Sequence, residues 1–283
     1  MSYREQIEQH LDSFPEMPPM CQNLLGYLDD PEVDFTTIKD IIQFDPGLTA
    51  NVLKVANSVH FAAARPINSL QTALARLGTK SIFELILSLN ISSKLLNSLP
   101  GYGLRANDLL RHSIWTAVAA QELANILGMS HTRMIFTIGL LHDLGLLLLD
   151  PFIKTERVSF NNAFEKQEKS FDQAERDILG MDHAEAGAQI LARWQLGPEV
   201  VAGVRWHHQP DKASEYEELI YLIHLADMLS LSEGIGTGLY GLQFVVSPKT
   251  VKTLGLRKKH LESVASTTLD KMRELENLLS DPG

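Results

Sequence analysis

Apolar residues recur along most of this chain at the three- and four-residue spacing of a helix face. The stretch LTANVLKVANS is an example, with one apolar face formed by Leu48, Val52, Val55 and Ala56. Only the segment from Gly241 to Val246 has a strand-like pattern. The pattern therefore predicts an all-α fold, a bundle of many helices.

Capping residues and helix breakers predict where the individual helices begin and end. Ser69 is placed to cap a helix that ends at Gly78. Asp182 and Glu185 have the spacing of a capping box, and Gly197-Pro198 suits a helix start. The predicted helices in the rest of the chain are 79–96, 108–127, 132–149 (ended by Pro151), 182–194, 197–210 and 216–231, while 154–180 is read as a helix or a surface excursion.

A run of helix-breaking residues, Pro100-Gly101-Tyr102-Gly103, divides the predicted helices into two groups. We therefore predict an amino-terminal helical subdomain over residues 1–100 and a second helical subdomain over residues 101–240. Residues 241–283 are expected to form a carboxy-terminal helical tail.

Composition and charge narrow the class of protein. Cys21 is the only cysteine, so no internal disulfide can form, and a reducing cytoplasm is the expected location. The longest apolar run is interrupted by two ionisable residues and is shorter than the ~18 residues of a membrane span. A net charge of −10 disfavours binding to nucleic acid, and residues 36–58, the one segment resembling a helix-turn-helix, have no basic face.

The stretch LLHDLG places two ionisable residues, His142 and Asp143, inside an otherwise apolar run. Apart from His131 and His260, which have polar or loop surroundings, the other histidines of the second half also lie close to carboxylates in sequence or directly follow one another. They occur in the groups Asp108 with His112, Asp182 with His183, His207 with His208, and His224 with Asp227.

Imidazole and carboxylate together are ligands for first-row divalent metals such as iron, manganese, zinc or nickel. The set is larger than one ion needs, and two ions ~3.5–4 Å apart would use it better, with Asp143 as the natural bridge. Structural explanations remain open for single members: a core histidine bonded to the backbone for His224, and a favourable helix-dipole interaction for Asp108 or for His207 and His208.

The order of these residues resembles the HD superfamily of metal-dependent phosphohydrolases, whose core is a histidine, a His-Asp doublet and a distant aspartate. The additional His183 and the His207-His208 doublet resemble the binuclear HD-GYP branch, which hydrolyses cyclic di-GMP. The resemblance implies a metal-ligand set of His112, His142, Asp143, His183, His207, His208 and Asp227, with Asp108 as an additional ligand. It also implies that Asp143 is the catalytic bridging residue.

The amino-terminal half resembles the HDOD (HD-related output domain) family, whose members are mostly regulatory modules in bacterial signalling. The resemblance covers roughly residues 10–230. It rests on motifs in the family's order: Pro15 and Pro18, Asp45-Pro46, Ala56-Asn57-Ser58, and TALARLG ending at Gly78.

The sequence departs from the HD-GYP pattern at the position of a phosphate-contacting lysine, where it has Leu146, and the GYP signature is absent. Two interpretations therefore stand. In one, two ions activate water for hydrolysis of a nucleotide or phosphoester. Arg111 and Arg205 are then the expected phosphate contacts, because they lie beside His112 and near the His207-His208 doublet in the sequence. In the other, the protein is an inactive signalling module that binds a small phosphorylated ligand or signalling proteins, and its ions are structural or sensory.

Overall fold

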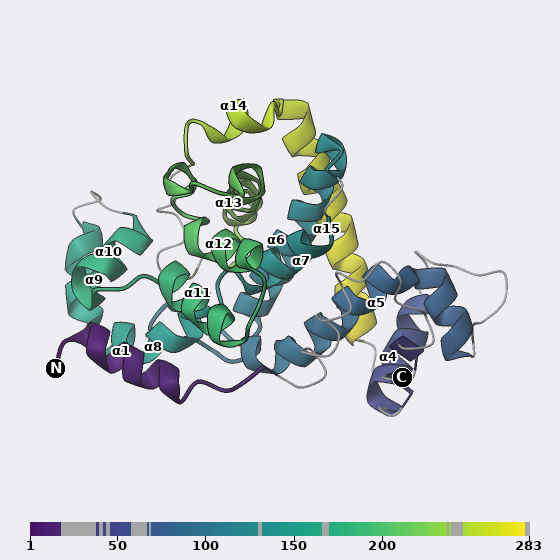
Figure 1. Ribbon diagram of the computed structural model, residues 1–283, viewed down its shortest axis with the longest axis horizontal. Helices are drawn as coiled ribbons and strands as arrows, with labels where there is room; N and C mark the ends of the chain where they lie inside the picture. The colour runs from purple at the N-terminus through teal and green to yellow at the C-terminus, as the bar shows by residue number, and fades with distance from the viewer. Residues whose placement is uncertain are drawn as a thin grey trace. The chain divides into compact units, whose positions relative to one another are not determined.

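The computed structural model describes residues 1–17, 38–39, 42–43, 46–57, 67, 69–129, 132–165, 170–236, 238 and 246–280. Across these ranges the protein is all-α, as predicted (Figure 1). Apart from one isolated bridge between Leu99 and Leu104, they contain no β-structure. Some predictions concern residues outside these ranges: Cys21, the motif residues Pro18, Asp45 and Ser58, and all of the strand-like segment except Val246.

The chain folds into two compact units. One comprises Met1–Glu16 and Ser92–Thr268, and the other comprises Met17–Ile91 and Leu269–Gly283. These units differ from the predicted ranges 1–100, 101–240 and 241–283. Residues 1–16 belong to the same unit as residues 92–268, and residues 269–283 belong to the same unit as residues 17–91. Helix α1 (Tyr3–Asp12) belongs to the larger unit, where the Tyr3 ring packs edge-on against Phe152 at 6.2 Å.

The smaller unit contains α4 (Pro46–Ala56) and most of α5 (Leu70–Leu95). Ser69 Oγ accepts a hydrogen bond from the Thr72 amide at 3.1 Å, which is the predicted cap. Gly78 has φ +76° and interrupts the helical backbone, so α5 is two helices joined at a kink where the sequence predicted a stop. The motif residue Asn57 makes two side-chain hydrogen bonds to the backbone of Ile67, at 2.7 and 2.8 Å.

The centre of the larger unit is formed by α6 (Asp108–Leu127), α7 (Thr132–Leu141) and α13 (Glu217–Ser232). Helices α6 and α7 lie side by side (Figure 1). They approach closely because Gly139 has no side chain: a Cβ there would lie 2.6 Å from Ala117 Cα. Helix α6 ends at Gly128 in the left-handed conformation, as predicted.

The predicted helix 132–149 is wrong at its centre and at its end. The helix stops at Leu141, residues 142–144 form a turn, and α8 (Gly145–Thr155) continues through Pro151. Burial of Phe152 and Ile153 in the core outweighs the low helix propensity of the proline. The stretch Met134–Thr155 is long and apolar enough to cross a membrane by length and composition, but 89% of its most apolar window is buried inside the protein, as in a core segment.

The remaining helices of the larger unit surround this centre. The described parts of segment 154–180 are largely helical and include α9 (Arg157–Glu165) and α10 (Phe171–Leu179). Asp182 caps the next helix by accepting from the Glu185 amide at 2.6 Å. The other elements are α11 (His183–Arg193), α12 (Pro198–Trp206), the 3-10 turn η2 (Pro210–Lys212), α14 (Thr250–Leu254) and α15 (Lys258–Ser280), whose last turns belong to the smaller unit.

Candidate metal centre

Seven of the predicted ligands come together inside the larger unit. They come from different elements: one from α6, two from the turn after α7, one from the start of α11, two from the turn directly after α12 and one from α13. They form two groups of potential ligand atoms, His112 with His142 and Asp227, and Asp143 with His183, His207 and His208.

In the first group, one carboxylate and two imidazoles meet. His112 Nε2 lies 3.1 Å from Asp227 Oδ1 and 3.1 Å from His142 Nε2. His142 Nε2 is 3.7 Å from the same Asp227 oxygen. All three side chains are almost completely buried, so water does not solvate them.

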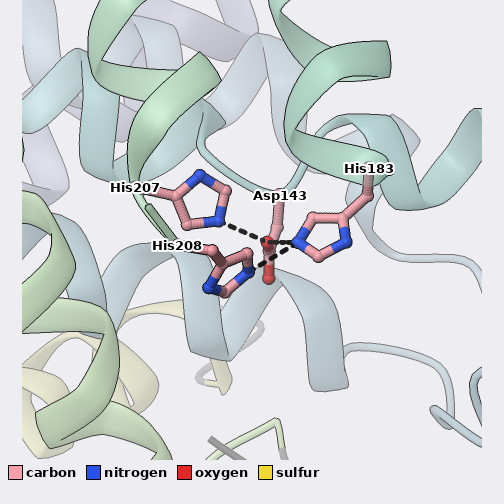
Figure 2. A group of neighbouring side chains, drawn as sticks. All are labelled: Asp143, His183, His207 and His208. Atoms are coloured by element: carbon pink, nitrogen blue, oxygen red, sulfur yellow. Dashed lines mark hydrogen bonds and ion pairs between the residues drawn. The ribbon is translucent and has the colours of Figure 1, made fainter. Parts of the chain in front are cut away.

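In the second group, three imidazoles surround the Asp143 carboxylate (Figure 2). The Nε2 atoms of His183 and His207 lie 3.5 and 3.7 Å from Asp143 Oδ1. His208 directly follows His207 in the chain, and its Nε2 atom lies 2.7 Å from His183 Nε2. The His208 side chain is 20% exposed, the most of any in the two groups, so the centre opens toward solvent on this side.

Asp143 connects the two groups through different oxygens. Its Oδ2 atom lies 3.2 Å from His112 Nε2 and 3.3 Å from His142 Nε2. Its Oδ1 atom faces the histidines of the second group. This is the arrangement expected of a carboxylate that bridges two ions. The turn at residues 142–144 makes it possible, because a continuous helix would point adjacent side chains ~100° apart.

The imidazole rings are oriented by hydrogen bonds on the side facing away from the centre. The Nδ1 atoms of His112, His142 and His207 lie 3.2, 2.7 and 2.7 Å from the carbonyl oxygens of Ile235, Gly139 and Val204. His183 Nδ1 lies 2.6 Å from Glu175 Oε2. A carbonyl can only accept, so the Nδ1 atoms beside it donate, and the Nε2 atoms are the ones that face the centre. Outer hydrogen bonds of this kind are typical of metal-binding histidines.

Two buried polar atoms in the centre, His207 Nε2 and Asp227 Oδ2, have no hydrogen-bond partner among the residues that the structure describes. Buried polar atoms are rarely left unpaired, because this costs about 1–3 kcal/mol each. The 3.1 Å contact between His112 Nε2 and His142 Nε2 also leaves room for only one proton. A cation in each group would pair with these atoms, so the residues present fit divalent metal.

The carboxylates determine the charge state of the first group in the absence of metal. Burial alone would lower the pKa of His112, but hydrogen bonds to Asp143 and Asp227 outweigh it and raise the pKa to about 9. Burial alone would raise the pKa of Asp143, but the adjacent His142 and His112 hold it well below its usual value.

The histidines of the second group differ from one another in charge. Burial opposes protonation of His183, yet the Glu175 carboxylate outweighs it and raises the pKa of His183 to about 10. Burial lowers the pKa of His207 well below its usual value, and the neighbouring histidines lower it further. At neutral pH, His207 is therefore uncharged, as a metal-binding imidazole must be, whereas His183 is protonated on both ring nitrogens.

Metal binding is expected to release protons, because an imidazole must be neutral at its ligating nitrogen. With raised pKa values of about 9 and 10, His112 and His183 hold protons at pH 7 that an ion must displace. Calorimetric titration in two buffers of different ionisation enthalpy measures this release. The release from these two residues should have its full value at pH 7 and decline as the pH rises through 9 and 10. A release that does not change over this range contradicts the charge states derived above.

Four residues considered from the sequence lie outside the two groups. The Asp108 carboxylate accepts from the Arg105 amide at 2.9 Å instead of reaching the centre, so its prediction as an additional ligand is not supported. Both nitrogens of His224 bond to backbone, Nδ1 to His207 O at 2.7 Å and Nε2 to the Ser247 amide at 3.0 Å, which is the structural explanation left open for it.

The two predicted phosphate contacts have other surroundings. Arg111 is exposed on α6. Arg205 lies over the Trp206 ring at 4.4 Å and pairs with Glu185 at 3.3 Å and Asp182 at 3.7 Å. Its charge is already compensated in this arrangement, so a phosphate would have to compete with two carboxylates.

Glu175, which is completely buried behind His183, was not among the residues predicted from the sequence. A signal was present in α10: Glu175 falls four residues after Phe171 and three before Ile178, so it is a charged residue on the apolar face of a helix. Ser230, whose hydroxyl lies 3.0 Å from His112 Nδ1, was also missed and has no comparable signal.

The fold and the centre together define an all-helical protein with a buried histidine–aspartate cluster able to hold divalent metal. A model of the HDOD domain matches residues 14–210 of the chain. The chain therefore belongs to the HDOD family.

Solved structures and one relative are similar to this chain. An HDOD domain protein of unknown function from Geobacter sulfurreducens is 24% identical with a TM-score of 0.78, over 97% of this chain and 98% of that one. A candidate phosphohydrolase from Shewanella amazonensis is 22% identical with a TM-score of 0.72, over 96% and 97%. At these identities the likeness shows the fold alone.

An uncharacterised protein of Treponema pallidum is 26% identical over 240 residues, which are 78% of this chain and 43% of that protein. The chain thus spans less than half the length of this relative.

Proposed function

We propose that this protein is an HDOD-type signalling protein whose centre holds two divalent ions and hydrolyses a phosphoester, with nucleotides as the favoured substrate class. The observation that carries the proposal is the bridging position of Asp143, with one oxygen toward each group of histidines. A purely structural ion needs only one such group.

Each residue has a role in this proposal. One ion would be held by His112, His142 and Asp227, and the other by His183, His207 and His208. Asp143 would be a ligand of both ions. Bound ions of this kind lower the pKa of water to supply a nucleophile and offset the charge of a phosphate. The chain itself orients the imidazoles, keeps bulk water from the buried groups and leaves the His208 side open for a substrate.

The ligand atoms favour certain metals and partners. The groups offer imidazole and carboxylate without thiolate, which suits iron or manganese and also accommodates zinc or nickel. The family relationship supports a role in bacterial signalling, with a small phosphorylated ligand or other signalling proteins as partners. The single cysteine favours the cytoplasm, the net charge of −10 disfavours nucleic acid, and the burial of the most apolar segment disfavours membrane binding.

A second candidate function is a signalling module that binds metal without turnover. A specific observation favours it: Leu146, at the position of the HD-GYP lysine, is buried, and Arg205 is paired with carboxylates. In this candidate the ions stabilise or switch the fold.

Metal analysis combined with a hydrolysis screen separates these candidates. The protein is purified without chelator, its metal content is measured, and p-nitrophenyl phosphate, bis-p-nitrophenyl phosphate and cyclic dinucleotides are offered as substrates. We expect about two equivalents of metal and a hydrolysis that chelation abolishes. Two equivalents without any turnover would favour the module, and protein that stays metal-free after reconstitution would exclude both.

A further inference from the structure

His183 is held differently from the other histidines of the centre. His112, His142 and His207 can donate from Nδ1 to backbone carbonyls. His183 Nδ1 instead bonds to a side chain, Glu175 Oε2, at 2.6 Å. The same oxygen accepts from the His183 backbone amide at 2.9 Å. The orientation of this ring therefore depends on one side chain.

Glu175 is itself fixed in place. It is completely buried, and its second oxygen, Oε1, accepts from the Tyr102 hydroxyl at 2.7 Å. With both oxygens bonded, the carboxylate cannot rotate without breaking a buried hydrogen bond. A carboxylate behind an imidazole fixes the tautomer of the ring and makes its other nitrogen a better metal ligand.

Other residues of α10 hold the second group from the same side. Asp172 Oδ2 accepts from Gln209 Nε2 at 3.0 Å, and Gln209 directly follows His208. Arg176 pairs with Asp172 at 2.5 Å and also with Asp182, the residue before His183. Both segments that bring histidines to the second group are thus bonded to α10. The bonds given above for the first group come from Ser230 and from backbone.

We propose that Glu175 is a positioning residue for the ion of the second group, and that α10 makes the difference between a centre with one ion and a centre with two. This inference rests on the proposed function, in that it requires the centre to bind metal. It assigns no contact with substrate to Glu175, which acts only through His183.

The test is a titration of metal-free protein with Co²⁺, followed by visible absorption and by metal analysis after gel filtration. The wild type should take up two equivalents. Glu175→Ala should keep the first and bind the second about 10–100-fold more weakly, the usual effect of losing an outer hydrogen bond to a ligand. Glu175→Gln should lie between, because its amide oxygen can still accept from His183 while the negative charge is lost.

Asp177→Asn is the matched control, an acid-to-amide change on the exposed side of α10 that should leave both steps unchanged. Circular dichroism of the metal-free variants checks their folding. If Glu175→Ala does not fold, Glu175→Gln decides: a weaker second step supports the inference, and an unchanged one overturns it.

The possible outcomes separate this inference from the proposed function. Two equivalents with unchanged affinities in Glu175→Ala, or loss of both ions together, would overturn the positioning role. So would a wild type that binds only one ion, and a wild type that binds none would overturn the proposed function as well. Selective loss of the second ion, in a protein that hydrolyses no phosphoester, would support the inference and count against hydrolysis.

Discussion

Replacing Asp143 with alanine is expected to remove both ions at once, an effect that no other single ligand should have. Its two oxygens face His112 and His142 on one side and His183 and His207 on the other. Each group would lose its shared anionic ligand, so metal affinity should decrease by more than ~100-fold, since outer-shell changes alone cost about 10–100-fold. Metal content after gel filtration measures the loss, and phosphoester turnover should disappear with it.

Asp108→Ala is the matched control for this variant. Asp108 lies one helical turn before His112, but its carboxylate bonds to Arg105, so its removal should leave the metal content at about the wild-type level. Retention of both ions by Asp143→Ala would contradict the bridging role.

The stability of Asp143→Ala distinguishes the two candidate functions. If the ions serve catalysis, the variant keeps its fold and loses turnover. If they are structural, the metal-free variant lacks a cooperative unfolding transition altogether, a larger effect than the higher unfolding temperature that any bound ion gives the loaded wild type.

Gly145→Ala is expected to produce the largest loss of stability of any substitution discussed for this protein. A Cβ at Gly145 would lie 2.0 Å from the carbonyl oxygen of His183 and 2.6 Å from the Gly187 amide nitrogen. Both are backbone atoms, so α8 and α11 must move apart. We expect a cost of about 3 kcal/mol or more, at the upper end of overpacking effects. Thermal unfolding should shift down by ~10 °C for a unit of this size.

Because the displaced residue is His183, the second group should also bind its ion more weakly in Gly145→Ala. Gly128→Ala is the control: it has φ +66° and no atom within 4 Å of an added Cβ, so only backbone strain of about 1 kcal/mol is expected. Equal unfolding temperatures for the two variants would show that α8 and α11 are not in close contact.

The helix ends that the sequence predicted best carry a strong local signal. Helix α6 begins at Asp108 and ends at Gly128, and α11 begins after the Asp182 cap. The prediction was wrong at Leu141, where no helix-breaking residue marks the turn, and at Pro151, where burial outweighs propensity. Local propensity therefore describes helix ends well only where tertiary contacts do not oppose it.

The sequence by itself determined the helical fold class, the HDOD resemblance and the identity of the side chains in the centre, because helix periodicity, caps and the spacing of histidines and aspartates are local properties of the chain. Only the tertiary structure decided which of these side chains form the two groups of ligands and which lie outside them. It placed Asp143 between two groups, left Asp108 with Arg105, bonded His224 to backbone and put Glu175 behind His183. Each of these outcomes depends on atoms far apart in sequence, or on the direction of a side chain, and neither is encoded in residue spacing.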